Sequence, residues 1–312
     1  MTKKDTKSKK TTNKNKEEGQ SLVSPNSTLT ITLGKKDVKE RYQSVLKKLA
    51  KNLKLDGFRK GNVPAKIAEE NLSREQVVQY VLEELVPDAY SKAIKAEKKA
   101  PITRPEFSIT STEEGKDWVV EAHFAELPEV STDKYETHAK AGVKAGQKAI
   151  KETNKKNSED KEKKDVKPLT KEQEKEITLQ HIFRELVTQL KPQVPEMLLK
   201  VETQHEFEHI SGQLKQLNMT VDEYLKRRQM SMEDLSQDLA VQTLSRLQLD
   251  LILGAIAKAK KLEVTDKDRE DYFATIKDEK MREQVKKDEH YLGHLNTNLL
   301  KQKVVDHLLA IA

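Results

Sequence analysis

The sequence predicts an α+β module followed by an all-α module of long helices. Stretches with period-two alternation at 28–33 and 107–124, separated by helical stripes, predict the first module. Helical periodicity that continues almost without a break from about residue 170 predicts the second module. Only 4% of the residues are aromatic and 35% are charged, a composition that favours helices and solvated segments over a strand-rich barrel.

The composition argues against several classes of protein. With 312 residues, the chain is long enough for about two domains. No apolar stretch approaches the ~18 residues of a membrane-spanning helix, and the absence of cysteine excludes disulfide scaffolds and thiol nucleophiles. The basic N-terminus has no apolar segment behind it, so we expect no secretory signal and a cytoplasmic location. The net charge is only +6, from 58 basic and 52 acidic residues, so the place where positive charge gathers matters more than its total.

The N-terminal part is expected to contain a tail, a strand and a helix. Residues 1–27 have almost no apolar content, which predicts a disordered basic tail. Polar and apolar residues alternate over 28–33, which predicts a half-buried strand. A helix should follow, because apolar residues recur at steps of three and four and form one stripe: Val38, Tyr42, Val45, Leu46, Leu49 and Leu53. We expect it to end at Gly57, since glycine is a common C-terminal helix breaker.

Two further helices and a hairpin complete the first module. Pro64 is suited to the first turn of a short helix that runs to about Asn71. Ser73 and Gln76 form a capping pattern before a longer helix. The hairpin should pair the strand around Phe107 with the strand 118–124. We therefore assign residues 28–140 to the α+β module.

The rest of the chain is divided by composition. Residues 141–169 are rich in Lys, Glu, Asn and Ser and contain no aromatic side chain, which predicts a polar charged linker. Residues 170–312 form the all-α module. Its helix starts are marked by three capping pairs: Thr220 with Glu223, Ser231 with Asp234, and Thr265 with Asp268.

The loop after the first helix carries the most informative residues. It reads Gly57-Phe58-Arg59-Lys60-Gly61-Asn62-Val63-Pro64, so two glycines bracket one aromatic and two cations. Between residues 35 and 60 there are 10 basic and 3 acidic side chains, a net charge of 10 − 3 = +7. A basic, aromatic-tipped turn suits an RNA-rich surface. By composition alone, the lysines could equally solvate a helix face while Phe58 packs into the local core.

The string Gly-Phe-Arg-x-Gly-x-x-Pro resembles the ribosome-docking signature of bacterial trigger factor, a chaperone family that meets nascent chains at the ribosomal exit tunnel. The order of elements from 28 to 129 is also similar to that family, and Val194–Leu198 resembles its substrate-cradling domain. The resemblance implies that Phe58, Arg59 and Lys60 contact a ribosomal protein and rRNA. It also implies that three residues shape the loop, namely Gly57, Gly61 and Pro64.

The resemblance further implies an ATP-independent holdase that shields nascent polypeptides, with no cofactor and no membrane partner. The sequence leaves open whether the protein forms a homodimer when it is off the ribosome.

Family members usually carry an FK506-binding-type prolyl-isomerase domain where this chain has the 141–169 stretch. With no aromatic residue to line a proline pocket, that activity is expected to be absent. Client binding, with packing between helices as the alternative role, is assigned to Met197, Leu198, Phe207, Met219, Met230 and Met232.

Two other functions remain open from the sequence. His205, Glu206 and His209 match the H-E-x-x-H zinc-peptidase pattern, in which both imidazoles share one face of a helix. Glu223 and Glu233 are the candidates for a third ligand by position. A solvated helix with interleaved His and Glu is the alternative interpretation. The chain could also be a general RNA- or DNA-binding protein with a helical oligomerisation domain.

Overall fold

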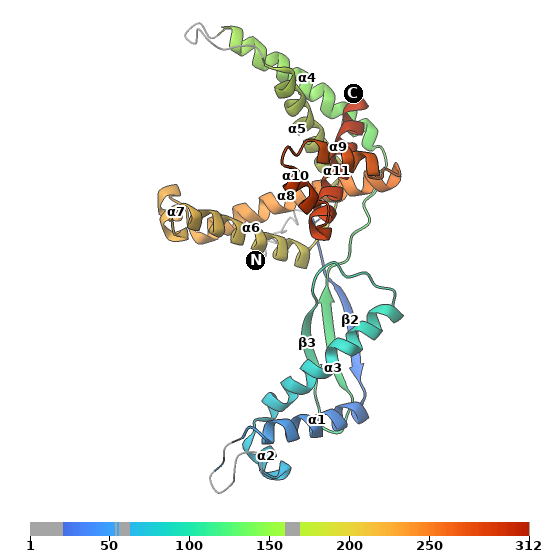
Figure 1. Ribbon diagram of the computed structural model, residues 1–312, viewed down its shortest axis with the longest axis vertical. Coiled ribbons are helices and arrows are strands. Elements are labelled where there is room, and N and C mark those ends of the chain that lie inside the picture. The colour runs from blue at the N-terminus through green and yellow to red at the C-terminus, as the bar shows by residue number, and fades with distance from the viewer. Residues whose placement is uncertain (1–20, 54, 56–62, 160–168, 312) are drawn as a thin grey trace, which may run out of the picture.

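The computed structural model describes residues 21–53, 55, 63–159 and 169–311. Figure 1 shows a small α+β module at one end of an elongated molecule, with helical extensions beyond it. The α+β module contains β1 Val23–Ser24, β2 Ser27–Leu33, α1 Lys35–Ala50, α2 Ala65–Asn71, α3 Arg74–Ala96, β3 Glu106–Ser111 and β4 Trp118–Phe124. The helical module contains α4 Tyr135–Glu159, α5 Lys171–Leu190, β5 Val194–Pro195, α6 Glu196–Gln216, α7 Val221–Arg228, α8 Met232–Ala259, α9 Asp266–Ala274, α10 Glu279–Val285 and α11 Glu289–Ala310.

The α+β module is a three-stranded antiparallel sheet with helices α1 and α3 on one face. The strand order is β2-β4-β3, so the predicted hairpin places its second strand in the centre. Side chains of β2 and β4 alternate between buried and more exposed, as the period-two pattern requires. The core is formed by Leu29, Ile31, Val45, Val77, Val81, Trp118, Val120 and Phe124, among others. The predicted fold class of this module is confirmed.

Local hydrogen bonds fix where the helices of this module begin. The Ser73 side chain accepts from the Gln76 amide at the start of α3, as the sequence predicts. Helix α1 has no capping side chain of its own at Gly34. Instead, the Lys35 amide donates to Oδ1 of Asp117, at 2.7 Å. The residue that precedes β4 therefore caps α1 from the strand next to β2.

The expected polar linker at 141–169 is wrong for its described residues, because 141–159 continues helix α4, which packs along α5. The contact is a close approach of two backbones. A Cβ atom built on Gly142 would lie 2.5 Å from Cα of Ile182, and one on Gly146 would lie 2.9 Å from Cα of Thr178. Glycine and alanine permit this packing while contributing little hydrophobicity. Counting large apolar residues therefore misses the helix; residues 160–168 lie outside the described part.

The expected disordered tail is wrong for residues 21–27. Strand β1 pairs in parallel with β5, and the Val194 amide donates to the Leu22 carbonyl at 2.9 Å. Oδ1 of Asn26 accepts from the Met197 amide at 2.7 Å. The pairing strand comes from a segment more than 160 residues away in the chain, so local composition could not reveal it. Residues 1–20 lie outside the described part of the chain.

The helical module is built around one core where α4, α5, α8 and α11 meet. Its largest fully buried side chains are Ile182, Leu186, Ile252, Ile256, Val304 and Leu308. Helices α6, α7 and the first half of α8 form an arm closed by Leu225, Leu235 and Leu239. Figure 1 shows this arm and the α4–α5 hairpin extending in different directions from the core. The three predicted capping boxes and the all-α class are confirmed.

Helix α8 has the length and apolar composition of a membrane-spanning helix, which the sequence reading did not expect. It also carries much of the core of the helical module, through Ile252, Leu253, Ile256 and Ala257. A buried core helix can have the same length and composition. The apolar face of α8 is thus explained by packing against α5 and α11.

Replacing Gly142 with alanine should destabilise the protein by about 1–3 kcal/mol, because its added methyl group meets the backbone of Ile182. The matched control is Gly212→Ala in α6, where nothing lies within 4 Å of the added atom. That variant should be more stable by about 0.5–1 kcal/mol, the difference in helix propensity. Urea unfolding followed by circular dichroism measures both, and equal effects would contradict the close approach of the helices.

Glu126 should make part of the stability depend on pH. Its carboxylate accepts from the Ala100 amide at 3.1 Å, from Ser27 Oγ at 2.8 Å and from Lys99 Nζ at 3.3 Å. These hydrogen bonds, the Ala100 amide first, lower the pKa of Glu126. Their contribution to the stability of the folded protein is present above the usual carboxyl pKa of about 4.3. It is lost as the pH falls through the lowered pKa that Glu126 has in the folded state.

The variant Glu126→Gln is therefore expected to lose stability at pH 7 and to show a shallower loss between neutral pH and pH 3. Urea unfolding at a series of pH values measures this dependence. Glu97→Gln, which removes an exposed carboxylate, is the control. A steep acid loss that persists in Glu126→Gln would assign the dependence to other groups.

Candidate functional site

The predicted docking contacts lie outside the described residues. These are Phe58, Arg59 and Lys60, together with Gly57 and Gly61. The structure describes both flanks of the loop. Pro64 is exposed and immediately precedes α2, which begins at Ala65, in agreement with the first-turn proline that the sequence predicts.

The flanks of the loop are held together by a small apolar cluster separate from the main core. Leu53 and Leu55 follow the end of α1 and pack with Val63 and Ile67 around the buried Ala50. Val63 is only 7% exposed. Because these residues leave the helix to form the cluster, α1 ends at Ala50 and not near Gly57. Burial of the flanks sets the position from which the loop leaves the module.

The helix before the loop presents a basic surface. Arg41 and Lys48 donate to the Glu84 carboxylate of α3, at 2.9 and 2.7 Å. These hydrogen bonds, Lys48 first, lower the pKa of Glu84. The other cations of this segment are exposed, namely Lys35, Lys36, Lys39, Lys47 and Lys51. Two cations thus tie α1 to α3, while the remaining ones are available to an anionic surface.

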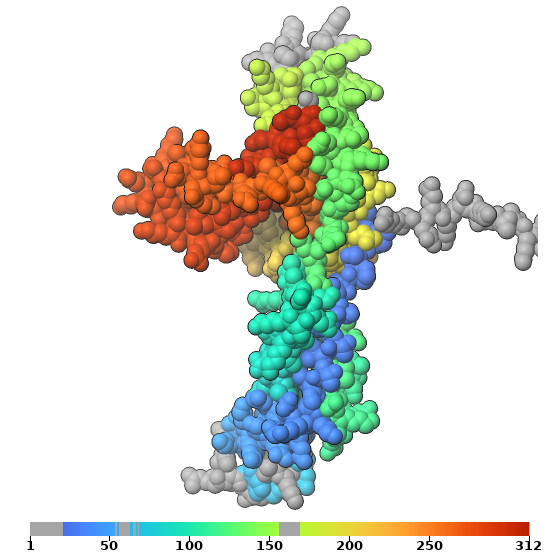
Figure 2. Space-filling view, turned by 90° about the vertical axis from the view of Figure 1, so that its right-hand side faces the viewer, coloured from blue at the N-terminus to red at the C-terminus, as the bar shows by residue number. Residues whose placement is uncertain are grey.

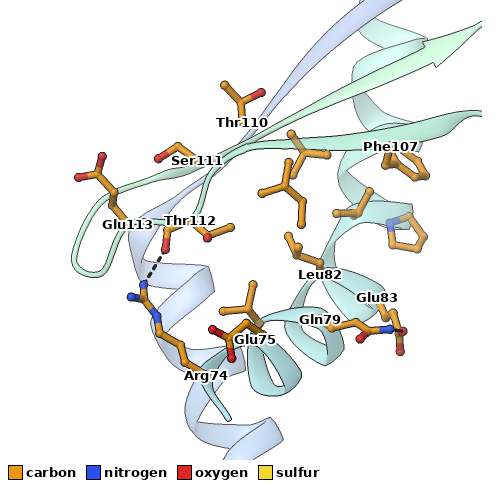
Figure 3. A pocket seen from close by; sticks show the side chains of 15 residues that line it. Arg74, Glu75, Gln79, Leu82, Glu83, Phe107, Thr110, Ser111, Thr112 and Glu113 are labelled. Carbon is orange, nitrogen blue, oxygen red and sulfur yellow. Dashed lines mark hydrogen bonds between the residues drawn. The ribbon is translucent and has the colours of Figure 1, made fainter.

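An open apolar groove lies between α3 and strand β3 (Figure 3). Its volume is ≈ 1050 Å³, and its apolar lining comes from Val78, Leu82, Val86, Pro87, Phe107, Ile109 and Val120. At one end, Nη2 of Arg74 donates to the Thr112 carbonyl at 2.8 Å. Phe107 is 44% and Ile109 57% exposed. The sequence predicted the strand but missed the groove, because alternation does not reveal how far a helix covers an edge strand.

The six client-binding candidates have different environments. Met197 is buried, and its Sδ accepts from Thr103 Oγ1 at 3.3 Å, so it joins the two modules and the prediction of an accessible contact is wrong. Phe207 and Met230 pack at the tip of the α6–α8 arm. Leu198 and Met219 are partly exposed, and Met232 is 46% exposed.

Two further exposed apolar side chains lie on the arm and are not among the six predicted client contacts. They are Leu217, 71% exposed, and Val241, 65% exposed. A single apolar residue at a helical position gives no signal of exposure in the sequence. Only the packing of α6 against α8 shows that they point away from it.

The zinc-peptidase pattern does not assemble a metal site. His205 and His209 share a face of α6, yet Glu206 forms an ion pair with Arg246 of α8, at 3.2 Å. Glu223, a proposed third ligand, accepts from the Thr220 amide at 2.9 Å and caps α7. Over the described ranges, no three His, Cys, Asp or Glu side chains are grouped to hold a metal ion.

The described chain thus combines an α+β module, in which the flanks of the basic loop pack together, with a helical module of extended arms. Residues 15–157 match the sequence model described as bacterial trigger factor protein. Residues 148–310 match the model of the trigger factor C-terminus, which covers more than half of the chain. The chain belongs to the trigger factor family. The two matches overlap at 148–157, so no segment remains between them for a third domain.

Individual relatives support the same assignment. The trigger factor of Streptococcus pneumoniae (strain JJA) is 35% identical over 107 residues, and that of Staphylococcus aureus (strain JH9) is 37% identical over 107 residues. Each match covers 34% of this chain and 25% of the relative, so the chain spans about a quarter of the length of these relatives.

A solved structure extends the likeness in fold to almost the whole chain. It was described in work on promiscuous substrate recognition by the trigger factor chaperone in folding and assembly. It matches with a TM-score of 0.56 at 14% identity, and covers 91% of this chain and 97% of its own.

Proposed function

We propose that this protein is an ATP-independent, ribosome-associated chaperone of the cytoplasm that shields unfolded segments of newly made proteins. The observation that carries the proposal is the Gly-Phe-Arg-x-Gly-x-x-Pro string at 57–64, which stands between two helices in a chain of the trigger factor family. The clamped flanks and the basic surface of α1 support it. The proposed partners are a ribosomal protein and rRNA beside the exit tunnel, and nascent polypeptides.

In this proposal the loop residues have distinct roles. Phe58 fills an apolar pocket or stacks on a base, while Arg59 and Lys60 contact phosphate groups. Gly57, Gly61 and Pro64 shape the turn. The exposed lysines of α1 add attraction to the same anionic surface and release counterions when they bind it.

The triple variant Phe58→Ala, Arg59→Ala, Lys60→Ala should abolish co-sedimentation with ribosomes while the far-ultraviolet helical signal stays unchanged. The matched control replaces two lysines and one exposed apolar residue outside the loop: Lys277→Ala, Lys280→Ala, Met281→Ala. It should bind as the unmodified protein does. Unchanged co-sedimentation of the loop variant would refute the docking assignment.

Salt gives a second measurement on the same samples. Binding of the unmodified protein should weaken steeply between 50 and 200 mM salt because phosphate contacts release counterions, as in complexes that lose ~10³-fold or more over this range. A flat response would contradict an rRNA contribution to docking.

Client binding is proposed to use many weak apolar contacts. The exposed residues of the α6–α8 arm, Leu217, Met232 and Val241, would act together with the groove residues Phe107 and Ile109. Partly exposed Leu198 and Met219 would contribute at the edges, and Phe207 and Met230 when the arm tip opens. Single segments should bind with affinities on the order of micromolar, so that clients leave without ATP.

Prolyl-isomerase activity is proposed to be absent. The N- and C-terminal family matches are contiguous, and the stretch 142–168 contains no Phe, Tyr or Trp to receive a proline ring. Holding, without catalysed isomerisation, would then be the whole contribution of this chain to folding.

The variant Leu217→Ser, Met232→Ser, Val241→Ser should bind an unfolded client at least roughly tenfold more weakly, a loss of about 1.4 kcal/mol. Each fully buried apolar side chain contributes about 1.5–3 kcal/mol, so partial burial of three suffices. Suppression of aggregation of a chemically denatured enzyme, titrated with the chaperone, measures this.

The control for this variant is Ile102→Ser, Leu127→Ser, Met281→Ser, which removes three exposed apolar residues away from the arm. Equal losses in both variants would argue for non-specific hydrophobic contact. Retained activity in the arm variant would place client binding elsewhere.

A further inference from the structure

Helix α4 carries a row of exposed lysines along one side. The row, called here the lysine row, consists of Lys140, Lys144, Lys148, Lys151 and Lys155. Their spacings of 4, 4, 3 and 4 residues place them within an arc of about 80° at ~100° per residue. With a rise of 1.5 Å per residue, the row is about 22 Å long. It is therefore long and narrow.

The opposite side of α4 is occupied by α5. Buried Ala139 and Val143, together with Gly142 and Gly146, lie on that side. Helical geometry puts the centre of the lysine row about 150° away from the centre of these packed residues. The row therefore faces away from α5, and Figure 2 shows α4 forming the outer surface of this part of the molecule. Backbone contact with α5 holds the lysines on a stiff two-helix support.

The positive charge at four members of the row, Lys140, Lys144, Lys148 and Lys151, is largely uncompensated. Glu152 is the one carboxylate between residues 140 and 155. It lies 4.0 Å from Lys148, and both side chains are more than 60% exposed, a geometry of little energetic weight. No carboxylate of the described residues lies within 4 Å of Lys140, Lys144 or Lys151.

We propose that the lysine row binds the phosphate backbone of RNA without regard to sequence. A narrow line of cations fits a strand with one negative charge per nucleotide. A membrane would offer a plane of charge, and α4 has no free apolar side to insert into it, because that side packs on α5. The row contains no arginine or aromatic residue to read bases, so phosphate contacts alone would act.

This site is separate from the proposed docking loop. Figure 1 shows the α4–α5 hairpin at the opposite end of the molecule from α1 and α2. The lysine row would add a second RNA contact that does not require Phe58, Arg59 or Lys60. Either contact can fail experimentally without affecting the other.

The test compares two full-length variants, both carrying Phe58→Ala, Arg59→Ala and Lys60→Ala to silence the loop. One variant replaces four residues of the row, Lys140, Lys144, Lys148 and Lys151, with glutamine. The control replaces four exposed lysines elsewhere with glutamine, namely Lys267, Lys277, Lys280 and Lys287. The probe is a fluorescein-labelled single-stranded RNA of 20 nucleotides and mixed sequence, titrated by anisotropy at 50–200 mM KCl.

The row variant should bind the RNA at least tenfold more weakly than the loop-silenced parent. The slope of log affinity against log salt should fall in magnitude by about 3, because each lost phosphate contact on a single strand contributes ~0.7. The control should change the slope by less than one unit. Matching far-ultraviolet circular dichroism and urea midpoints would show that α4 and α5 remain paired.

Three outcomes would overturn the proposal. Equal losses in the row variant and the control would assign RNA binding to net charge. Full displacement of the RNA by poly-glutamate at equal charge concentration would indicate a site for acidic protein segments. Loss of binding to phosphatidylserine-containing vesicles in the row variant, with RNA binding intact, would indicate a membrane partner.

Discussion

The close packing of α4 on α5 is the contact on which the helical module depends. Gly142 and Gly146 let two backbones approach to distances that no other residue allows. This pairing brings Ile182 and Leu186 against α8 and α11, where the largest buried side chains of the module gather. The core that supports the α6–α8 arm is thus assembled around two residues without side chains.

The two modules are joined by more than the connection between β4 and α4. Strand β1 pairs with β5. The sulfur of Met197 accepts a hydrogen bond from Thr103 Oγ1, and the Met197 amide donates one to Oδ1 of Asn26. Lys200 also forms an ion pair with Glu106 at 2.8 Å. These contacts tie the α+β module to the base of the α6–α8 arm, where α6 begins.

Much of the fold could be predicted because its signals are local. The strand at 28–33, the Ser73 cap, the hairpin and three capping boxes depend on residues within a few positions of one another. The Gly-Phe-Arg-x-Gly-x-x-Pro string was also visible, since all its members are adjacent in the chain. The errors occurred where packing uses small residues or distant partners: α4, strand β1 and Met197.

The candidate site shows the same division. The sequence alone determined the class of each module and the basic character of the loop, because short-range pattern and charge decide these. The ribosome contacts of the loop stay a prediction that the resemblance implies. Only the tertiary structure decided that Met197 is buried, that Phe107 and Ile109 border an open groove, and that a row of lysines on α4 is exposed. Exposure depends on which surfaces distant segments cover, and no spacing along the chain carries that information.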